Sequence, residues 1–193
     1  MSSWGATTTD EAKPKYLTTV EKRTVYATTG GWTAAAGGND NASADREVLI
    51  AIGGLSGGTA NTAGLAAATV SSVNWNIDTF DKSAGGTLSI TVNYNEAVDV
   101  VTTGGTPTIA VAGTGGRNHV LDYSAGTGTN RLTFIEPIAG GNAATNAADV
   151  LSVAAQNITK NGGTIKDKGA STNAQIAISA GVGTAAGTIT VVA

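Results

Sequence analysis

The sequence predicts an all-β protein built around a β-sandwich, and three observations lead to this fold class. Of the 193 residues, 27 are glycine and only 13% are charged, which is unlike a typical soluble helical enzyme. Short runs of alternating apolar and polar residues recur from residue 70 onward. Glycine pairs and an Asn-Gly sequence separate these runs about every 8 to 12 residues, a spacing typical of sandwiches and barrels.

Two of these runs alternate most clearly. Residues 73–77 place Val, Trp and Ile on one face of a strand, and residues 88–94 do the same with Leu, Ile, Val and Tyr. Further strands are expected at residues 107–112, 120–123, 131–137, 150–154, 174–179 and 188–192. Residues 142–155 are rich in alanine, the residue with the highest helix propensity, so one short helix is expected there and none elsewhere.

The first 68 residues follow a different pattern. Their charged residues show no helical or strand period, and β-prone runs occur only at residues 15–20, 24–28 and 46–52. Residues 55–68 are mostly Gly, Ala, Thr and Asn, as in a flexible connector. The sequence therefore predicts an extended N-terminal arm and linker over residues 1–68, followed by the sandwich over residues 69–193.

An extended arm would become ordered by adding its short strands to the sheet edge of a partner. Large aromatic side chains would anchor it, because a glycine-rich arm offers no local core in which to bury them. The predicted partner-binding residues are Trp4, Tyr16, Tyr26, Trp32, Arg46, Val48 and Ile50.

Composition excludes several classes of function. A net charge of −3 without clustered Lys or Arg argues against nucleic-acid binding. The absence of cysteine excludes disulfides and thiolate metal sites. No run approaches the roughly 18 apolar residues of a membrane span, and the first residues lack the pattern of a signal peptide, so neither a signal nor a membrane anchor is expected.

Candidate catalytic residues are few, and no P-loop or nucleophile elbow occurs. His119 is the only histidine, and an ordinary exposed strand position is expected for it. Glu96 and Glu136 could form a glycosidase pair only if the fold brought them within about 5 to 10 Å; Glu96 is expected to end a strand instead. The sequence thus predicts a non-enzymatic protein without a cofactor.

Four acids near strand ends leave two interpretations open. They are Asp78, Asp81, Asp99 and Asp167. Carboxylates at such positions can meet around Ca²⁺, but their spacing matches no EF-hand loop. Solvated turn acids are the favoured interpretation, and no metal site is predicted.

The second part of the chain resembles a repeat of bacterial Ig-like domains. The resemblance rests on residues 86–100, 105–111, 121–134, 157–158 and 162–167. It implies an Ig-like sandwich, a module found in tandem as spacers or adhesive stalks. Such a fold carries many unrelated roles and does not by itself indicate an activity.

The first part looks like the N-terminal region of structural proteins of tailed phages of marine bacteria, in residues 10–17, 30–32, 37–41 and 46–52. This resemblance implies a virion protein that decorates the outer surface of the capsid. Its partners would be the major capsid protein and other copies of itself, in a homo-oligomer. The alternative is a phage tail-associated or bacterial surface adhesin module that binds a host surface glycan; a polysaccharide hydrolase is the least supported reading.

Overall fold

The computed structural model describes residues 13–36, 43, 45–56, 65, 67–143, 145–168 and 172–193. Within them the protein is an all-β, sandwich-like fold, as the composition and alternation predict. The elements are α1 (Glu21–Thr24), β1 (Val25–Thr28), β2 (Gly31–Ala34), β3 (Glu47–Ala51), β4 (Val70–Trp75), β5 (Phe80–Asp81), β6 (Gly85–Val101), β7 (Thr108–Gly113), the 3₁₀ turn η1 (Thr114–Gly116), β8 (His119–Ala125), β9 (Thr129–Ala139), β10 (Val150–Ser152), β11 (Gln156–Asn157), β12 (Thr164–Asp167), β13 (Ala177–Ile178), α2 (Ala180–Ala185) and β14 (Thr188–Val192).

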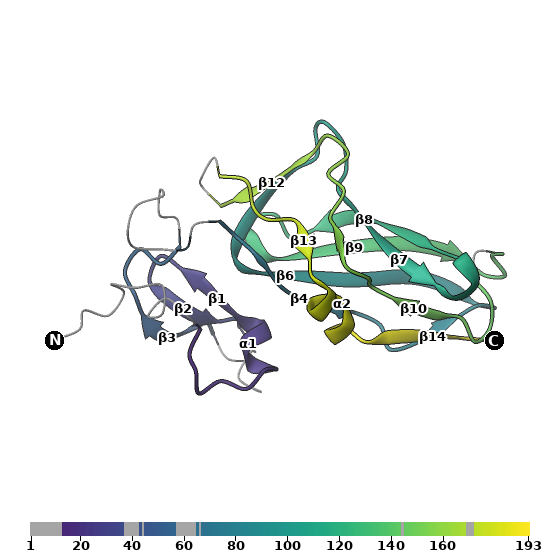
Figure 1. Ribbon diagram of the computed structural model, residues 1–193, viewed down its shortest axis with the longest axis horizontal. Helices are drawn as coiled ribbons and strands as arrows, with labels where there is room; N and C mark the ends of the chain where they lie inside the picture. The colour runs from purple at the N-terminus through teal and green to yellow at the C-terminus, as the bar shows by residue number, and fades with distance from the viewer. Residues whose placement is uncertain are drawn as a thin grey trace.

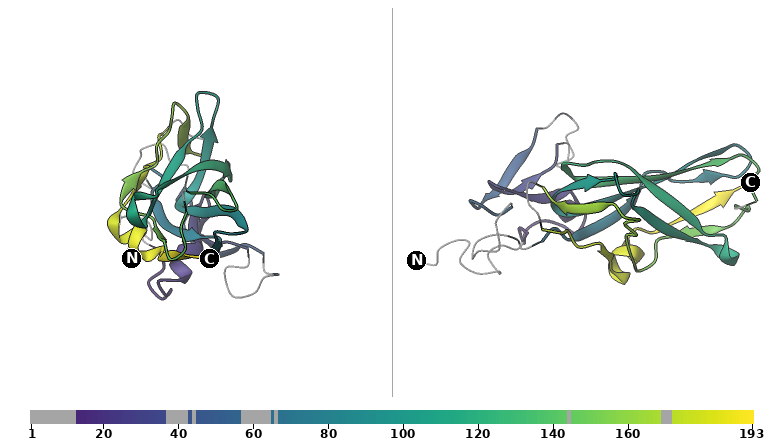
Figure 2. Two further views of the ribbon diagram at one scale, coloured as in Figure 1. Left: turned by 90° about the vertical axis from the view of Figure 1, so that its right-hand side faces the viewer. Right: turned by 90° about the horizontal axis from the view of Figure 1, so that it is seen from above.

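Strand β6 organises the main sheet. It pairs antiparallel with β9 along most of its length, with β4 near its middle and with β12 near its end. The strand order of this main sheet runs β3-β2-β1-β6-β9-β8-β7-β10-β14-β5, with β4 and β12 also paired to β6. Strands β11 and β13 form a separate two-stranded sheet. Figure 2 shows the main sheet folding over itself when the molecule is viewed from one end.

The main core lies inside this folded sheet. It combines residues of β6 and β9, such as Ile90, Val92 and Phe134, with residues of β10 and β14, such as Leu151 and Ile189. Each side chain belongs to the inward-facing set of its strand, since successive side chains on a strand alternate between faces. The aromatic rings of Tyr123 and Phe134 pack edge to face, with 5.8 Å between their ring centres, an arrangement that aromatic pairs prefer.

The predicted extended arm is wrong for the described residues before residue 57. Strands β1, β2 and β3 form an antiparallel meander, and α1 precedes it. We call this part, residues 13–36, 43 and 45–56, the N-terminal unit. It has a small core of its own, formed by Val25, Ala27, Trp32, Ala34, Ile52 and Leu55. The arm prediction failed because it did not include β2. This strand lies between β1 and β3 in the sheet and lets them bury their apolar side chains in a shared core.

The N-terminal unit joins the sandwich through its own sheet. Ala27 of β1 pairs in parallel with Glu96 of β6. Two of the three β-prone runs, 24–28 and 46–52, therefore add to the sheet of the same chain as β1 and β3, through the kind of strand addition that was expected with a partner. The β-prone run at residues 15–20 is wrong, because these residues form turns before α1. In Figure 1 the N-terminal unit lies at one end of an elongated molecule, and β14 leads to the C-terminus at the other end.

The predicted helix within residues 142–155 is also wrong where the structure describes that segment. It holds turns and β10 instead, and Ala148 has a left-handed backbone (φ 67°). The left-handed Ala148 interrupts any helix there, because a right-handed helix requires a negative φ at every residue. Short helices form elsewhere: Thr18 and Glu21 bond reciprocally at the start of α1, and Ser179 caps α2.

Candidate functional site

Strand β3 is an outer edge of the main sheet. It pairs with β2 on one side and stands last in the strand order, so no strand of the described residues pairs with its other side. Val48 is 52% exposed, and Leu49 and Ile50 are half-buried. The strand, of sequence EVLIA, contains no Lys or Pro, and its one charged residue is Glu47 at the first position. β3 can therefore accept another strand.

The predicted partner-binding residues lie in different environments. Trp4 lies outside the described residues, and nothing is assigned to it. Tyr16 and Val48 are exposed, Arg46 is exposed just before β3, and Ile50 is half-buried on it. Tyr26 and Trp32 are buried, so an anchoring role for these two rings in a partner surface is wrong. The N-terminal unit provides the local core that the sequence interpretation assumed was lacking.

A second junction between the N-terminal unit and the sandwich involves a buried acid. The Ser56 hydroxyl donates a 3.1 Å hydrogen bond to Oε2 of Glu96, which is 2% exposed. Oε1 of Glu96 has no hydrogen-bond partner among the described residues. Burial raises the pKa of Glu96 to about 7; the bond from Ser56 opposes this shift and the neighbouring charge of Asp167 adds to it.

Asp167, on β12, is the second buried acid of this region. Its Oδ1 accepts the backbone N–H of Ala68 at 2.8 Å. Burial raises its pKa, although the bond from Ala68 opposes the rise. Two carboxyl groups thus lie between the N-terminal unit and the sandwich in an environment that favours their neutral forms.

A signal for the burial of Glu96 was present in the sequence. Leu88, Ile90, Val92 and Tyr94 occupy alternate positions, and continuing that alternation places Glu96 on the same inward face. The expectation that Glu96 ends a strand is wrong, because β6 continues to Val101.

Lys13 makes a third contact between the two parts. Its Nζ donates to the backbone oxygen of Lys22 at 2.7 Å and to Oγ of Ser71, on β4, at 3.4 Å. The same amine lies 5.7 Å from the centre of the Trp32 ring, in a cation–π arrangement. Burial, reinforced by the positive charge of Lys22, lowers the pKa of Lys13 to about 8.

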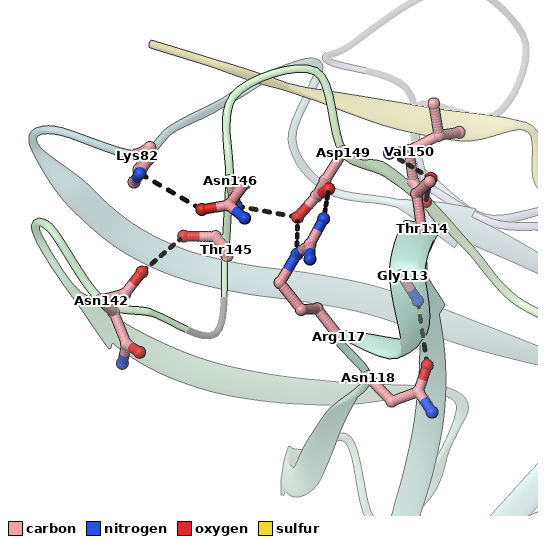
Figure 3. Close-up of polar contacts among 10 residues, drawn as sticks. All are labelled: Lys82, Gly113, Thr114, Arg117, Asn118, Asn142, Thr145, Asn146, Asp149 and Val150. Atoms are coloured by element: carbon pink, nitrogen blue, oxygen red, sulfur yellow. Dashed lines mark hydrogen bonds and ion pairs between the residues drawn. The ribbon is translucent and has the colours of Figure 1, made fainter.

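A polar cluster lies around the turn that contains η1, away from the N-terminal unit (Figure 3). The guanidinium of Arg117 donates two hydrogen bonds to the carboxylate of Asp149, whose side chain is 3% exposed. The Asp149 carboxylate also accepts a hydrogen bond from the backbone N–H of Asn146. The side-chain oxygen of Asn146 in turn accepts a hydrogen bond from Nζ of Lys82. The bonds from Arg117 lower the pKa of Asp149 to about 2. The cluster ties three separate segments of the sandwich together, around Lys82, Arg117 and residues 146–149.

His119 is buried at the start of β8, and the expectation of an exposed strand histidine is wrong. His119 lies two positions before Leu121 on β8, so both side chains are on the face of the strand that points to the core. Nδ1 of His119 lies 3.2 Å from Oε2 of Glu136, but neither ring nitrogen has hydrogen-bond geometry with any described residue. The Ser-His-acid geometry of a nucleophilic hydrolase is therefore not assembled around it in the described part of the chain.

The fold does not bring Glu96 and Glu136 together. Glu136 pairs with Leu88, eight residues before Glu96 on β6. At about 3.3 Å per residue, the two acids lie roughly 25 Å apart along the strand, far beyond the separation that glycoside hydrolysis requires.

The four candidate calcium ligands do not gather at one place, although Asp99 and Asp167 occupy neighbouring positions of the paired strands β6 and β12. Asp167 is buried, so the expectation of a solvated turn acid is wrong for it. Asp81 accepts the backbone N–H groups of Ser83 and Ala84, which is the turn role expected for it. Asp99 pairs across the sheet with Lys166, in the other half of the molecule from Asp81. Across the described residues, no three His, Asp or Glu side chains form a group that could hold a metal ion.

Comparison of the chain with models of protein families, with curated proteins and with solved structures finds no match. No helix in the described ranges is long and apolar enough to cross a membrane. The surfaces of the molecule are therefore the basis for assigning a role.

Proposed function

We propose that this chain is a non-enzymatic virion protein that decorates the outer surface of a phage capsid. One observation carries the proposal: β3 is an apolar edge strand at one end of an elongated molecule. A partner strand bound there would leave the sandwich projecting outward. The resemblance of the N-terminal residues to phage structural proteins supports the major capsid protein as this partner.

The binding mode follows from the geometry of an edge strand. Backbone N–H and C=O groups on the free edge of β3 would pair with an extended segment of the capsid protein, and Val48 would pack against its side chains. Other copies of the chain could meet through the same edge, which would give a homo-oligomer.

The test is co-sedimentation with capsids that lack this chain. Wild-type protein should bind saturably and raise the resistance of the capsids to heat. Val48→Lys should abolish binding, because it places a charge against the added strand. Val120→Lys is the matched control, since Val120 is also a half-exposed strand valine (55%) but lies on β8 of the sandwich.

Two outcomes would overturn the proposal. One is the absence of saturable binding by the wild type, and the other is equal binding by Val48→Lys and the wild type. Circular dichroism of both variants must first show an unchanged strand content, so that a loss of binding reports the surface and not the fold.

The second candidate is an adhesin module that binds a host glycan. A cleft between the N-terminal unit and the sandwich, lined in part by Arg46 and Lys168, favours this candidate.

A further inference from the structure

A cleft of about 470 Å³ opens between the N-terminal unit and the sandwich. Six separate segments of the chain converge on it. Its walls are formed by Tyr26, Ala27, Thr28, Thr29, Arg46, Ser56, Ala97, Gly128, Thr129, Asn130 and Lys168. The volume falls within the range of about 300–1,000 Å³ that is usual for small-molecule sites.

The charge of the lining is opposite to that of the whole chain. Arg46 and Lys168 are both cationic, and none of the lining residues is acidic, although the protein carries a net charge of −3. Nζ of Lys168 is held on the wall by a 2.9 Å bond to the backbone oxygen of Gly128. Two acids lie close to the lining: Glu96 is bonded to Ser56, and Asp99 lies beside Gly128, next to the Lys168 ammonium.

The remaining polar groups are neutral. Thr28, Thr29, Ser56, Thr129 and Asn130 contribute hydroxyl and amide groups from both sides of the cleft. Such groups exchange hydrogen bonds with alcohols, whereas Arg and Lys form the stronger, charge-assisted bonds with carboxylates. A ligand that matches this lining carries several hydroxyls and one carboxylate.

We propose that this cleft binds an acidic saccharide, with the carboxylate directed toward Arg46 and Lys168 and the hydroxyls toward the neutral side chains. An acidic peptide fits less well, because β1 is paired on both sides, with β2 and β6, and offers no free strand edge along the cleft. This site goes beyond the capsid-binding role and does not depend on it.

The test is calorimetric or NMR titration of the full chain with glucuronate and galacturonate. Glucose, galactose and triglutamate serve as comparison ligands. Saturable millimolar binding of a uronate should weaken about tenfold or more in Arg46→Gln and in Lys168→Gln, since each variant removes a charge-assisted bond. Arg131→Gln and Lys160→Gln are matched controls, because both residues are exposed and lie outside the lining; they should bind as the wild type does.

Three results would overturn the site: no saturable uronate binding, equal binding of the neutral sugars, or tighter binding of triglutamate. Unchanged binding in both Arg46→Gln and Lys168→Gln would do so as well. The capsid role is tested independently, since Lys168→Gln should still sediment with capsids and Val48→Lys should still bind the uronate. Failure of one proposal is thus distinguishable from failure of the other.

Discussion

The hydroxyl of Ser56 donates its hydrogen bond to a carboxyl group, that of Glu96, which the sandwich buries almost completely. Ser56 belongs to the N-terminal unit and Glu96 to β6, so this bond joins the two parts of the molecule beside the Ala27–Glu96 strand pairing. Because burial favours the neutral carboxyl, the junction depends on protonation.

The first prediction concerns the pH dependence of stability. The pKa of Glu96 is raised to about 7 in the folded state, from an ordinary value of 4.5. Its protonated form therefore contributes stability that is fully present below pH 4.5 and lost as the pH rises through 7; the raised pKa of Asp167 acts in the same direction. Glu96→Gln should raise the free energy of unfolding at pH 8 by about 1–2 kcal/mol, because the variant no longer has a buried carboxyl to ionise. The gain is smaller than the full pKa shift of Glu96 would give, because solvent near the cleft screens part of the charge.

Urea unfolding at pH 5, 7 and 8.5 measures this effect. The wild type should lose stability across the series more steeply than Glu96→Gln. Parallel pH profiles of the two proteins would show that Glu96 does not control the junction. Glu47→Gln is a suitable control, since Glu47 is exposed at the first position of β3.

The second prediction concerns Arg117 and Asp149. Arg117→Met leaves the Asp149 carboxylate buried without its cation, so Tm at pH 7 should fall by roughly 5 °C or more. The folded pKa of Asp149 is about 2, below its ordinary 3.8, so the stabilisation is present above pH 4 and lost as the pH falls toward 2. The difference in Tm between wild type and variant should therefore shrink in acid.

A thermal double-mutant cycle with Asp149→Asn measures the coupling. The double variant should be less destabilised than the sum of the two single variants. Strict additivity of the three Tm changes would mean that the pair does not stabilise the fold.

The third prediction concerns Trp32, which is buried and not a partner anchor. Trp32→Ala should destabilise the N-terminal unit by about 3–5 kcal/mol, because it leaves a cavity among Val25, Ile52 and Leu55. Hydrogen exchange should accelerate in β1–β3 and remain slow in β7–β10. Val48→Ala, at an exposed site, should change stability by less than about 0.5 kcal/mol. Unchanged exchange in β1–β3 of Trp32→Ala would contradict the packing described.

The fourth prediction concerns Gly31, at the start of β2. Its φ is 129°, and an added Cβ would lie 2.0 Å from the backbone oxygen of Ile50 on β3. Gly31→Ala should separate β3 from β2 and cost about 2 kcal/mol or more. Gly53→Ala is the control, since an added Cβ there meets no atom within 4 Å. Equal unfolding midpoints for the two variants would show that β3 adapts without cost.

Alternation in the sequence located most strands of the sandwich. The run 88–94 lies within β6, the run 131–137 lies within β9, and residues 188–192 coincide with β14. The same alternation, extended by one step, would also have placed Glu96 and His119 on inward faces. Their polarity led to the opposite interpretation, because charged residues and histidine are seldom fully buried.

The N-terminal residues were harder to interpret, because their strands are short and only marginally amphipathic. β2 begins with a glycine whose role depends on the close approach of Ile50, a contact that no local pattern specifies. The cleft could not be predicted either, since its lining comes from six segments that are distant along the chain.

The sequence by itself thus determined that this protein is all-β, where most of the sandwich strands run and which of their faces turns inward, because strand periodicity is a local property of the chain. Only the tertiary structure decided that the N-terminal residues fold into a unit of their own, that this unit docks on β6, and that Glu96 and Trp32 become buried. Those outcomes depend on contacts between residues far apart in sequence, such as Ala27 with Glu96, and local periodicity does not encode them.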